Sequence, residues 1–394
     1  MHHSFARWDR PTEQDLEDYA RLMAVSFGTK VDSSARWLGR VGPARARVIL
    51  ADDQVGAALA SYDMGQFFGG RSVACWGIAG VAVQPHLRRC GLASAMMRRV
   101  LEDAHAQGVP LSSLFAANHP LYRSVGYETA GTRALASIAP DRIRVREPSG
   151  SVRPMDEQDE AVRRALYQRM AAARPGHLNR EAGLWRRATH SRDDVPLRSW
   201  LALSPAGEPE GYITLQPGPG AGISQELEVV DLVATSPWAV RRLLGFLGDH
   251  ASVVRSVRFP SAPSCPFLRS LAEPRVCWED STGWLLRVVS LVPALEDRGW
   301  PAAVAGRVEL ELHDPLLPGN SGRWTLEVEG GQARVTRGGA GDVRMDPRGL
   351  ACTYSGFVSP AEAAAVGLLE GPDYALATLG ALLAGPAPWT LDMF

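Results

Sequence analysis

The chain has 394 residues, which is too long for one ordinary globular core and predicts two or three domains. Apolar residues make up 45% and charged residues 22%, the proportions of a soluble globular protein. The net charge of −1 supplies no basic field, so we expect no nucleic-acid partner.

The five cysteines are scattered along the chain and form no C-x-x-C pair. This usage favours a reducing compartment and argues against a zinc site or a disulfide framework. No run of 18 apolar residues occurs, and the first residues lack the apolar segment of a secretion signal. We therefore expect a cytoplasmic protein with no membrane partner.

The first third of the chain alternates helix and strand signals. A helix is predicted over residues 13–27, because Pro11 and Thr12 are good start signals and Gly28 is a stop signal. A second, shorter helix is expected around residues 35–38. Apolar alternation and turn residues predict strands over residues 46–51, 56–62, 71–83 and 112–117.

The stretch from Val81 to Ser94 joins an apolar strand to a helix through a glycine turn. Pro85 ends the strand, and the R-x-x-G-x-A turn that begins at Arg88 supplies small residues where backbone can approach a ligand closely. From Leu92 onward, apolar residues recur at helical spacing. The unpaired amides of the turn, the positive end of the helix dipole and the arginines together form an anion site.

By itself this pattern is consistent with two structures. One is a site for the pyrophosphate of a nucleotide cofactor, and the other is an ordinary connection between a strand and a helix. The chain contains neither the G-x-G-x-x-G fingerprint nor the G-x-x-x-x-G-K-[ST] loop, and its only lysine is Lys30. A Rossmann or P-loop site is therefore not indicated.

The segment from Ala116 to Tyr127 follows the next predicted strand and contains a helix start. Tyr122 lies in this short helix, and the residues alone leave open whether its phenol acts as an acid or packs in the core. Tyr127 follows Gly126 and is expected to pack or to open the last strand of the unit.

A second α/β unit is expected after a polar, arginine-rich linker over residues 140–150. The order strand, turn, helix recurs from Val229 through residues 239–250, but Pro237 and Trp238 replace the glycine turn. We therefore expect a degenerate repeat of the first unit that holds no cofactor. The unit is also predicted to contain helices over residues 156–173 and 181–188 and strands over residues 200–203, 211–215 and 226–233.

A third region is expected to open at residues 284–289. Its strands alternate between apolar and polar residues, which predicts an antiparallel sheet, and helices follow on one face. Such a domain would either carry an apolar ligand or serve as a scaffold, and we favour the scaffold. The strands are predicted over residues 308–312, 324–328 and 333–336, and the helices over residues 347–353, 360–369 and 374–383.

This domain order resembles the Eis (enhanced intracellular survival) family of GNAT-superfamily N-acetyltransferases. The resemblance implies an α/β (α+β) fold with tandem GNAT-like domains, the second degenerate, followed by a sterol-carrier-protein-like α+β domain. The implied boundaries are 1–139, 140–288 and 289–394. The marks of the family here are Val81 to Val83, Arg88 to Ala93, Leu121 to Tyr127, Trp284 to Arg287, Val292 to Glu296 and the last residue, Phe394.

The resemblance also implies roles for particular residues. Tyr122 would be the general acid, and the carboxylate of Phe394, threaded back into the first domain, would be the general base. Acetyl-CoA would be the acyl donor, no metal would be needed, and the assembly would be a homo-hexamer. The residues that match the family's contacts to acetyl-CoA are Val81, Ala82, Val83, Arg89, Cys90, Gly91, Leu92, Ala93, Ser94, Ala117 and Asn118.

The chemistry of acetyl transfer fits these roles. A primary amine with a pKa of about 10 is mostly protonated at neutral pH, so it must lose a proton before or during its attack on a thioester. A carboxylate in a desolvated cleft is a stronger base than one in water. A phenol within hydrogen-bond reach can give a proton to the departing thiolate in a concerted step.

We expect direct acetyl transfer to a primary amine of a small molecule, with an aminoglycoside or related amino-sugar antibiotic as the leading class. Phe27, Trp37, Trp389 and Met393 would give the substrate site apolar or ring character, although core packing explains them equally well. Family members that act on aminoglycosides often have an acidic residue before the terminal phenylalanine; Met393 here puts a cation preference in doubt. The alternatives are a protein-lysine or peptide acetyltransferase and a non-catalytic CoA- or lipid-binding scaffold.

Overall fold

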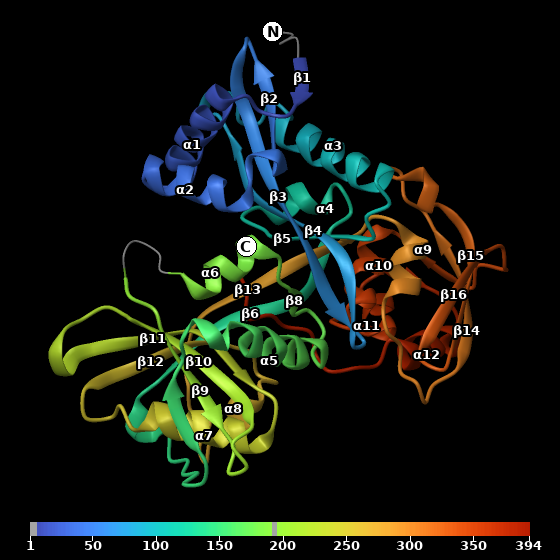
Figure 1. Ribbon diagram of the computed structural model, residues 1–394. Coiled ribbons are helices and arrows are strands. Elements are labelled where there is room, and N and C mark those ends of the chain that lie inside the picture. The colour runs from blue at the N-terminus through green and yellow to red at the C-terminus, as the bar shows by residue number, and fades with distance from the viewer. Residues whose placement is uncertain (1–5, 191–194) are drawn as a thin grey trace.

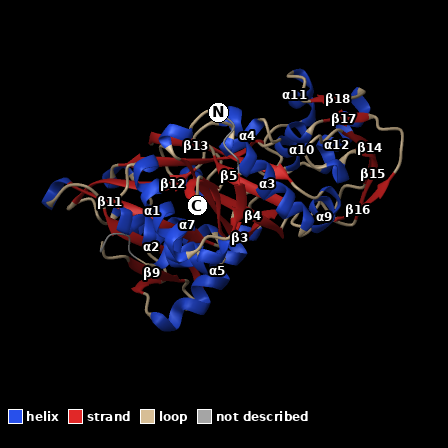
Figure 2. Ribbon diagram, turned by 90° about the horizontal axis from the view of Figure 1, so that it is seen from above, coloured by secondary structure: helices blue, strands red, loops and turns tan. Residues whose placement is uncertain are grey.

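The computed structural model describes residues 6–190 and 195–394. Figure 1 shows three lobes around the last residue of the chain, with the N-terminal lobe at the top, a second lobe at the lower left and a third lobe at the right. Seen from above in Figure 2, the third lobe stands to one side of the other two. The three lobes follow one another in chain order, with two exceptions. Residues 277–288 and the last seven residues, 388–394, which we call the tail, return to the sheet of the N-terminal lobe.

The N-terminal lobe has helices on both faces of a twisted sheet (Figure 1). Thr12 begins the first helix with a capping box to Asp15, and Gly28 ends it with a φ of 65°. The helices are α1 (Glu13–Phe27), α2 (Val31–Val41), α3 (Leu92–Ala106) and α4 (His119–Arg123). The strands are β1 (Ala6–Asp9), β2 (Ala46–Ala51), β3 (Gln54–Phe68), β4 (Arg71–Val83), β5 (Leu111–Phe115) and β6 (Glu128–Ile138).

The second lobe repeats the order of strand and helix without the glycine turn. Its strands are β7 (Ser151–Pro154), β8 (Leu178–Asn179), β9 (Arg198–Leu203), β10 (Pro209–Pro217), β11 (Gln225–Ala234), β12 (Val254–Ser261) and β13 (Cys277–Val288). Its helices are α5 (Glu160–Ala172), α6 (Ala182–Thr189), α7 (Pro237–Gly248) and α8 (Pro266–Arg269). Helices α5 and α7 both contact β10 and β11.

One sheet runs through both of these lobes, in the order β1-β2-β3-β4-β5-β13-β6-β12-β11-β10-β9-β7, with β8 paired to β3. Strand β13 lies between β5 and β6 and is antiparallel to both. The prediction that residues 284–289 open a third region is therefore wrong. Every side chain from Trp284 to Val288 is buried, so this continuous apolar run is a central strand covered on both faces.

The third lobe has its own sheet, in the order β16-β15-β14-β17-β18. The strands predicted over residues 308–312, 324–328 and 333–336 pair antiparallel as expected. The sheet also has two strands that were not predicted: β17 lies on the far side of β14 and pairs with it in parallel, and β18 pairs with β17. The helix expected over residues 360–369 is shorter, since Gly367 at a φ of 74° separates α11 from β18. The elements are α9 (Leu291–Asp297), β14 (Gly306–Leu312), β15 (Gly322–Glu329), β16 (Gln332–Arg337), β17 (Val343–Met345), α10 (Pro347–Tyr354), α11 (Pro360–Ala365), β18 (Leu369–Glu370) and α12 (Asp373–Leu382).

The third lobe is docked on the large sheet through α10, which contacts both β6 and β13. Tyr354 of α10 packs edge-on against Phe68 of β3, with ring centroids 5.0 Å apart. Within the described residues, no helix is both long and apolar enough to cross a membrane.

Candidate active site

The parallel strands β4 and β5 separate in the middle of the N-terminal lobe. Their last paired residues are Ile78 and Leu114, whereas β4 continues to Val83. At the same place the pairing of β4 with β3 shifts register. Gly80 adopts a φ of 62° there, and the Tyr19 hydroxyl donates to its carbonyl over 2.9 Å. The backbone from residue 79 to Val83 is therefore unpaired on the β5 side, which leaves a slot for a linear ligand.

The chain turns sharply between β4 and α3. After a 3-10 turn at Pro85–Leu87, Arg89 and Gly91 adopt positive φ values of 67° and 87°. Gly91 caps α3 without a side-chain hydrogen bond, and the first turn of α3 contains no acidic residue. A Cβ atom on Gly91 would meet nothing within 4 Å, so the glycine is required by its φ and not by crowding. The amides that begin α3 are therefore accessible to an anion.

The corresponding helix start in the second lobe is built differently. The Ser236 hydroxyl caps α7 by accepting from the amide of Ala239 over 3.1 Å. The same hydroxyl donates to the carboxylate of Glu210. A helix start that is already capped and has a carboxylate beside it disfavours a phosphate, which accounts for the degenerate second unit.

We call the point at which β4 and β5 separate, after Ile78 and Leu114, the fork. The residues matched to acetyl-CoA contacts lie on its two sides. Val81 and Val83 are half-buried in β4, while Arg89 and Cys90 in the turn are exposed. In α3 Leu92 is buried in the core, so only its backbone can face a ligand. Ala82 of β4 is buried, Ala93 and Ser94 of α3 are half-buried, and Ala117 and Asn118, which follow β5, are exposed.

Tyr122 lies in α4, which follows the end of β5. Asn118 caps this helix by accepting from the amide of Leu121 over 3.4 Å. Tyr122 is 5% exposed, and its ring packs edge-on against Tyr127 at a centroid distance of 6.1 Å. Burial raises the pKa of the Tyr122 phenol to about 12, so the phenol is protonated at neutral pH.

Phe394, the last residue of the sequence, is folded back into the N-terminal lobe (Figure 1). Its ring packs edge-on against Tyr62 of β3 and Phe115 of β5, with centroid distances of 6.3 and 5.4 Å. It also lies against Gly77 of β4, which pairs with Ser113 one step before the strands separate. The structure thus places the last residue of the chain beside the fork, more than 270 residues from it in sequence.

The predicted substrate residues have different surroundings. Trp37 packs edge-on against Tyr62 at a centroid distance of 6.5 Å and lies near Gly80, so Trp37 and Phe394 both pack against the ring of Tyr62. Phe27 ends α1 and is 49% exposed, and Met393 is 43% exposed. Trp389 is a core residue, because it is 4% exposed and packs on His177.

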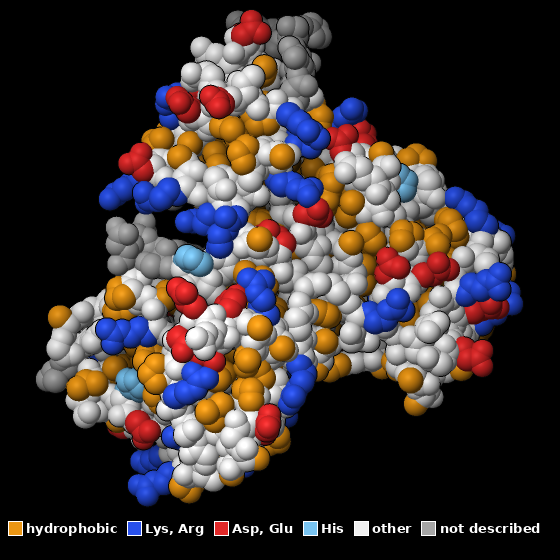
Figure 3. Space-filling model, viewed as in Figure 1, with side chains coloured by type: hydrophobic (Ala, Val, Ile, Leu, Met, Phe, Trp, Pro, Cys, Tyr) orange, Lys and Arg blue, Asp and Glu red, His pale blue; other side chains and the backbone are white. Residues whose placement is uncertain are grey.

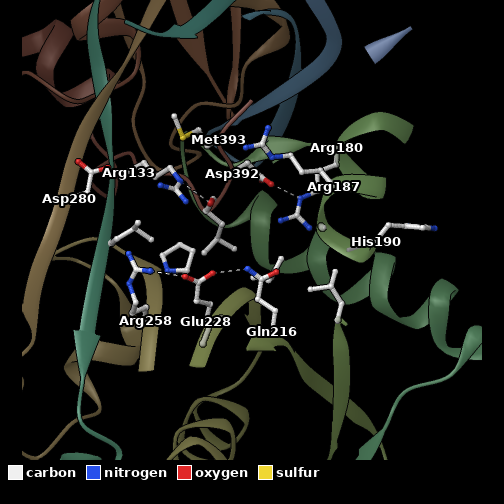
Figure 4. Close-up of a pocket in the computed structure, with 17 residues that line it drawn as sticks. Arg133, Arg180, Arg187, His190, Gln216, Glu228, Arg258, Asp280, Asp392 and Met393 are labelled. Atoms are coloured by element: carbon white, nitrogen blue, oxygen red, sulfur yellow. Dashed lines mark hydrogen bonds and ion pairs between the residues drawn. The ribbon is translucent and has the colours of Figure 1, made fainter. Parts of the chain in front are cut away.

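Met393 lines a cavity of about 330 Å³ that lies between β6 and the second lobe (Figure 4). Its wall carries charges of both signs: Arg133, Arg180, Arg187 and Arg258 against Glu228, Asp280 and Asp392. On the surface, Figure 3 shows a hollow between the first and second lobes with Lys and Arg side chains along its upper edge. The side chains that line this cavity therefore do not form an acidic cluster of the kind that would bind a polycationic substrate.

Sequence reasoning missed the residues that hold the tail. Phe394 is received by Tyr62, Gly77 and Phe115, and nothing in their sequence context marks them as neighbours of the last residue. A signal did exist for Asp231, because a carboxylate inside the apolar run Val229 to Val233 must have a buried partner. That partner is Arg180.

The arrangement combines the parts that acyl transfer requires. The glycine turn before α3 and the open edge of β4 can hold a phosphate-bearing, linear donor. A protonated phenol, Tyr122, lies on the helix that follows β5, and the last residue, Phe394, packs against β3, β4 and β5. Among the described residues, no group of three or more His, Cys, Asp or Glu side chains is arranged to hold a metal.

Comparison with known proteins gives consistent matches along the chain. Models of acetyltransferase (GNAT) domains match residues 7–130 and 176–288, and a sterol carrier protein domain model matches residues 291–391. These matches confirm the predicted fold class. The glycine turn from Arg88 to Ala93 lies within the first of these matches.

Similar proteins include an uncharacterized N-acetyltransferase of Streptomyces coelicolor, 30% identical over 76% of this chain and 75% of the relative. The N-acetyltransferase Eis of Mycobacterium tuberculosis is 27% identical over 92% of both chains. Among solved structures, a GCN5-related N-acetyltransferase from Anabaena variabilis has a TM-score of 0.95 and 29% identity, covering 98% of this chain and all of that one. Eis1 from Mycobacterium abscessus shares the fold, with a TM-score of 0.81, 24% identity and coverage of 98% and 99%.

Proposed function

The chain belongs to the Eis-like family of GNAT N-acetyltransferases, and on that basis we propose that it transfers the acetyl group of acetyl-CoA to a primary amine of a small molecule. The observation that carries the proposal is the position of Phe394 beside the fork of β4 and β5. A last residue that returns to the site can bring its α-carboxylate to the incoming amine.

In the proposed site, the turn from Arg89 to Ser94 holds the pyrophosphate of acetyl-CoA, and the unpaired edge of β4 at Val81 to Val83 holds its pantetheine arm. The residues fit these tasks because Gly91 has the required positive φ and no acidic side chain stands in the first turn of α3. Ala117 and Asn118 border the other side of the arm. Bound in this way, acetyl-CoA supplies a thioester as the acyl donor.

Two proton-transfer roles complete the proposed mechanism. The carboxylate of Phe394 accepts a proton from the ammonium group of the substrate, directly or through a water, and so generates the nucleophilic amine. Tyr122 donates its proton to the departing thiolate, which requires a phenol that stays protonated at working pH. The raised pKa of Tyr122, about 12, supports that requirement.

The acceptor is proposed to lie between α2, α6 and the tail, where Trp37 and Met393 border the opening and Phe27 stands farther out on α1. An aminoglycoside or related amino sugar is the first class to test, since the expected family includes enzymes that act on them. The mixed charges around Met393 favour a second candidate, an amine that also carries an acidic group.

A panel of amines scored by release of CoA thiol tests the proposal. We expect release with a small-molecule amine, and mass spectrometry should show one acetyl group on that amine. Release only with lysine-containing peptides would replace the proposal by the protein-lysine alternative. No release with any amine would contradict it in favour of a CoA- or lipid-binding scaffold.

Three further expectations belong to the same proposal. Domain boundaries are placed after residues 139 and 288, and the protein is expected to act in the cytoplasm. A homo-hexamer is expected from the family, and light scattering would detect it as six times the chain mass of 42.5 kDa.

A further inference from the structure

The last seven residues of the chain run across the second lobe before they enter the site. The backbone of the tail pairs with β6, because the amide of Thr132 donates to Pro388 over 3.3 Å and the amide of Thr390 donates to Thr132 over 3.1 Å. Arg133 Nε then donates to the carbonyl of Leu391 over 3.2 Å. These bonds hold the tail in place as far as Leu391.

Beyond Leu391 the tail is held by the side chain of Asp392. Arg180 Nε donates to Oδ1 of Asp392 over 2.9 Å. The Tyr167 hydroxyl lies 2.9 Å from Oδ2 of Asp392 and 2.8 Å from the carbonyl of Leu178. A hydroxyl has one proton to donate, and the charged carboxylate is the stronger acceptor.

Arg180 has a second partner that does not belong to the tail. Its Nη1 and Nη2 donate to the two oxygens of Asp231 over 2.7 and 3.1 Å, and the Tyr212 hydroxyl donates to the same carboxylate over 2.7 Å. The guanidinium also stacks on Tyr167, 3.8 Å from the ring centroid. The side chains of Arg180 and Asp231 are 1% and 0% exposed.

Burial alone would lower the pKa of Arg180, but the carboxylates of Asp231 and Asp392 outweigh it and hold the pKa well above its ordinary value. Arg180 is therefore a permanent, fixed charge in the second lobe. The second lobe, which lacks the glycine turn, thus presents this charge to the tail residue Asp392.

We propose that Arg180 and Tyr167 are positioning residues that clasp Asp392 and thereby fix the carboxylate of Phe394 beside the fork; this inference rests on the proposed function. Asp392 is two residues from Phe394, a reach of about 7 Å in extended chain. Among the hydrogen bonds of the described residues, those of the Asp392 side chain are the last to hold the tail before Phe394. Without it the last three residues pivot about Leu391, and a displacement of about 1 Å at the base is enough to lower a rate about 100-fold.

Asp392→Ala tests the clasp without unfolding the lobe, because Arg180 keeps both hydrogen bonds to Asp231. We expect kcat to fall by about 30-fold or more, while the Kd for acetyl-CoA stays within about 2-fold. Asp392→Asn, which keeps an acceptor oxygen but not the charge, should lie between the alanine variant and the wild type. An Asp392→Ala protein with the kcat of the wild type would overturn the proposal.

A matched control is Glu147→Ala, which removes another carboxylate from an arginine in the same lobe. Glu147 pairs with Arg241 at 3.0 Å, remote from the tail in sequence and in its contacts. Its kcat is expected to equal that of the wild type. An equal fall in kcat for Glu147→Ala and Asp392→Ala would mean that any lost ion pair in this lobe has the effect, and would overturn the specific role of Asp392.

A second measurement reports whether the tail is held in place, and it does not depend on enzymatic turnover. Carboxypeptidase is added to the folded protein, and loss of Phe394 is followed by intact mass. We expect the residue to be released about tenfold faster or more from Asp392→Ala than from the wild type. Equal rates would overturn the clasp even if kcat had fallen. A wild type that acetylates no amine contradicts the proposed function instead, and the release rates still decide the clasp.

Discussion

Gly77 and Phe394 are in direct contact across the site. A Cβ atom on Gly77 would lie 2.9 Å from Cε2 of Phe394 and 2.8 Å from Cε of Met64. These distances are shorter than carbon atoms tolerate, so the absence of a side chain at this point in β4 makes room for the last ring of the chain.

Gly77→Ala should therefore displace the ring of Phe394 and with it the proposed base. Overpacking of this kind costs about 1–3 kcal/mol, and we expect kcat to fall about tenfold or more with little change in acetyl-CoA affinity. Gly39→Ala is the matched control, because a Cβ atom there meets nothing within 4 Å and kcat should not change. If Gly77→Ala retains the kcat of the wild type, the ring does not set the position of the base.

Tyr122→Phe removes one hydroxyl and should lower kcat by about 100-fold to 10,000-fold, the usual worth of a general acid. Acetyl-CoA affinity, measured by calorimetry, should remain close to that of the wild type. Tyr127→Phe is the comparison: it deletes a buried hydrogen bond to Ser112, 2.7 Å long, and should cost about 1 kcal/mol of stability with no comparable loss of rate. Equal kcat values for wild type and Tyr122→Phe would return Tyr122 to the packing residues.

The stability of the folded tail should depend on pH through His177. This side chain is fully buried against Trp389, with ring centroids 4.7 Å apart. Burial, aided by Arg174 and Arg180, holds the pKa of His177 well below its ordinary value. Because the unfolded chain binds the proton more readily, the contribution of this group is complete above a pH of about 6.5 and is lost as pH falls below it.

Thermal unfolding between pH 7.5 and 5.5 measures this effect. The melting temperature of the wild type should fall more over that range than that of His177→Leu, which has no proton to bind. Parallel curves for the two proteins would show that His177 contributes no pH dependence.

The third lobe is tied to the turn after Tyr122 by a buried ion pair. Arg287 Nη2 lies 2.7 Å from Asp314, both side chains are 0% exposed, and Arg287 Nε donates to the carbonyl of Val125 over 3.0 Å. Asp314→Ala leaves Arg287 charged and unpaired in the core, so we expect a loss of about 3–5 kcal/mol in chemical denaturation. Glu17→Ala, which breaks an exposed pair with Arg21, should cost less than about 1 kcal/mol. Similar losses for the two variants would contradict a structural role for the buried pair.

Local patterns were enough to predict most elements of the fold. The glycine turn before α3, the helix capped by Thr12 and the alternating strands of the third lobe all follow from nearest-neighbour rules. The place of β13 did not follow, because a fully apolar run such as Trp284 to Val288 indicates a buried strand but not which strands it pairs with. Its pairing with β5 and β6 is a long-range contact that the local sequence does not encode.

The candidate site, like the fold, has residues that the sequence marked and residues that it did not. The turn from Arg88 to Ala93 was visible as a motif, whereas the neighbours of Phe394 were not, since they come from three separate strands. Asp231 could in principle be identified as a buried charge, because it lies in an apolar run, whereas Arg180 stands among polar residues and gives no such signal. Nothing in the local sequence indicates that Arg180 also pairs with Asp392 of the tail.

The central claim is that the α-carboxylate of Phe394 serves as the base, and one measurement tests it most directly. A glycine is appended after Phe394, its presence is confirmed by intact mass, and kcat is compared with that of the unextended protein on the same amine. We predict a loss of about 100-fold or more with the Kd for acetyl-CoA within about 3-fold, because the anion turn is untouched while the carboxylate is moved one residue away. An extended protein with the full kcat of the original would contradict the claim.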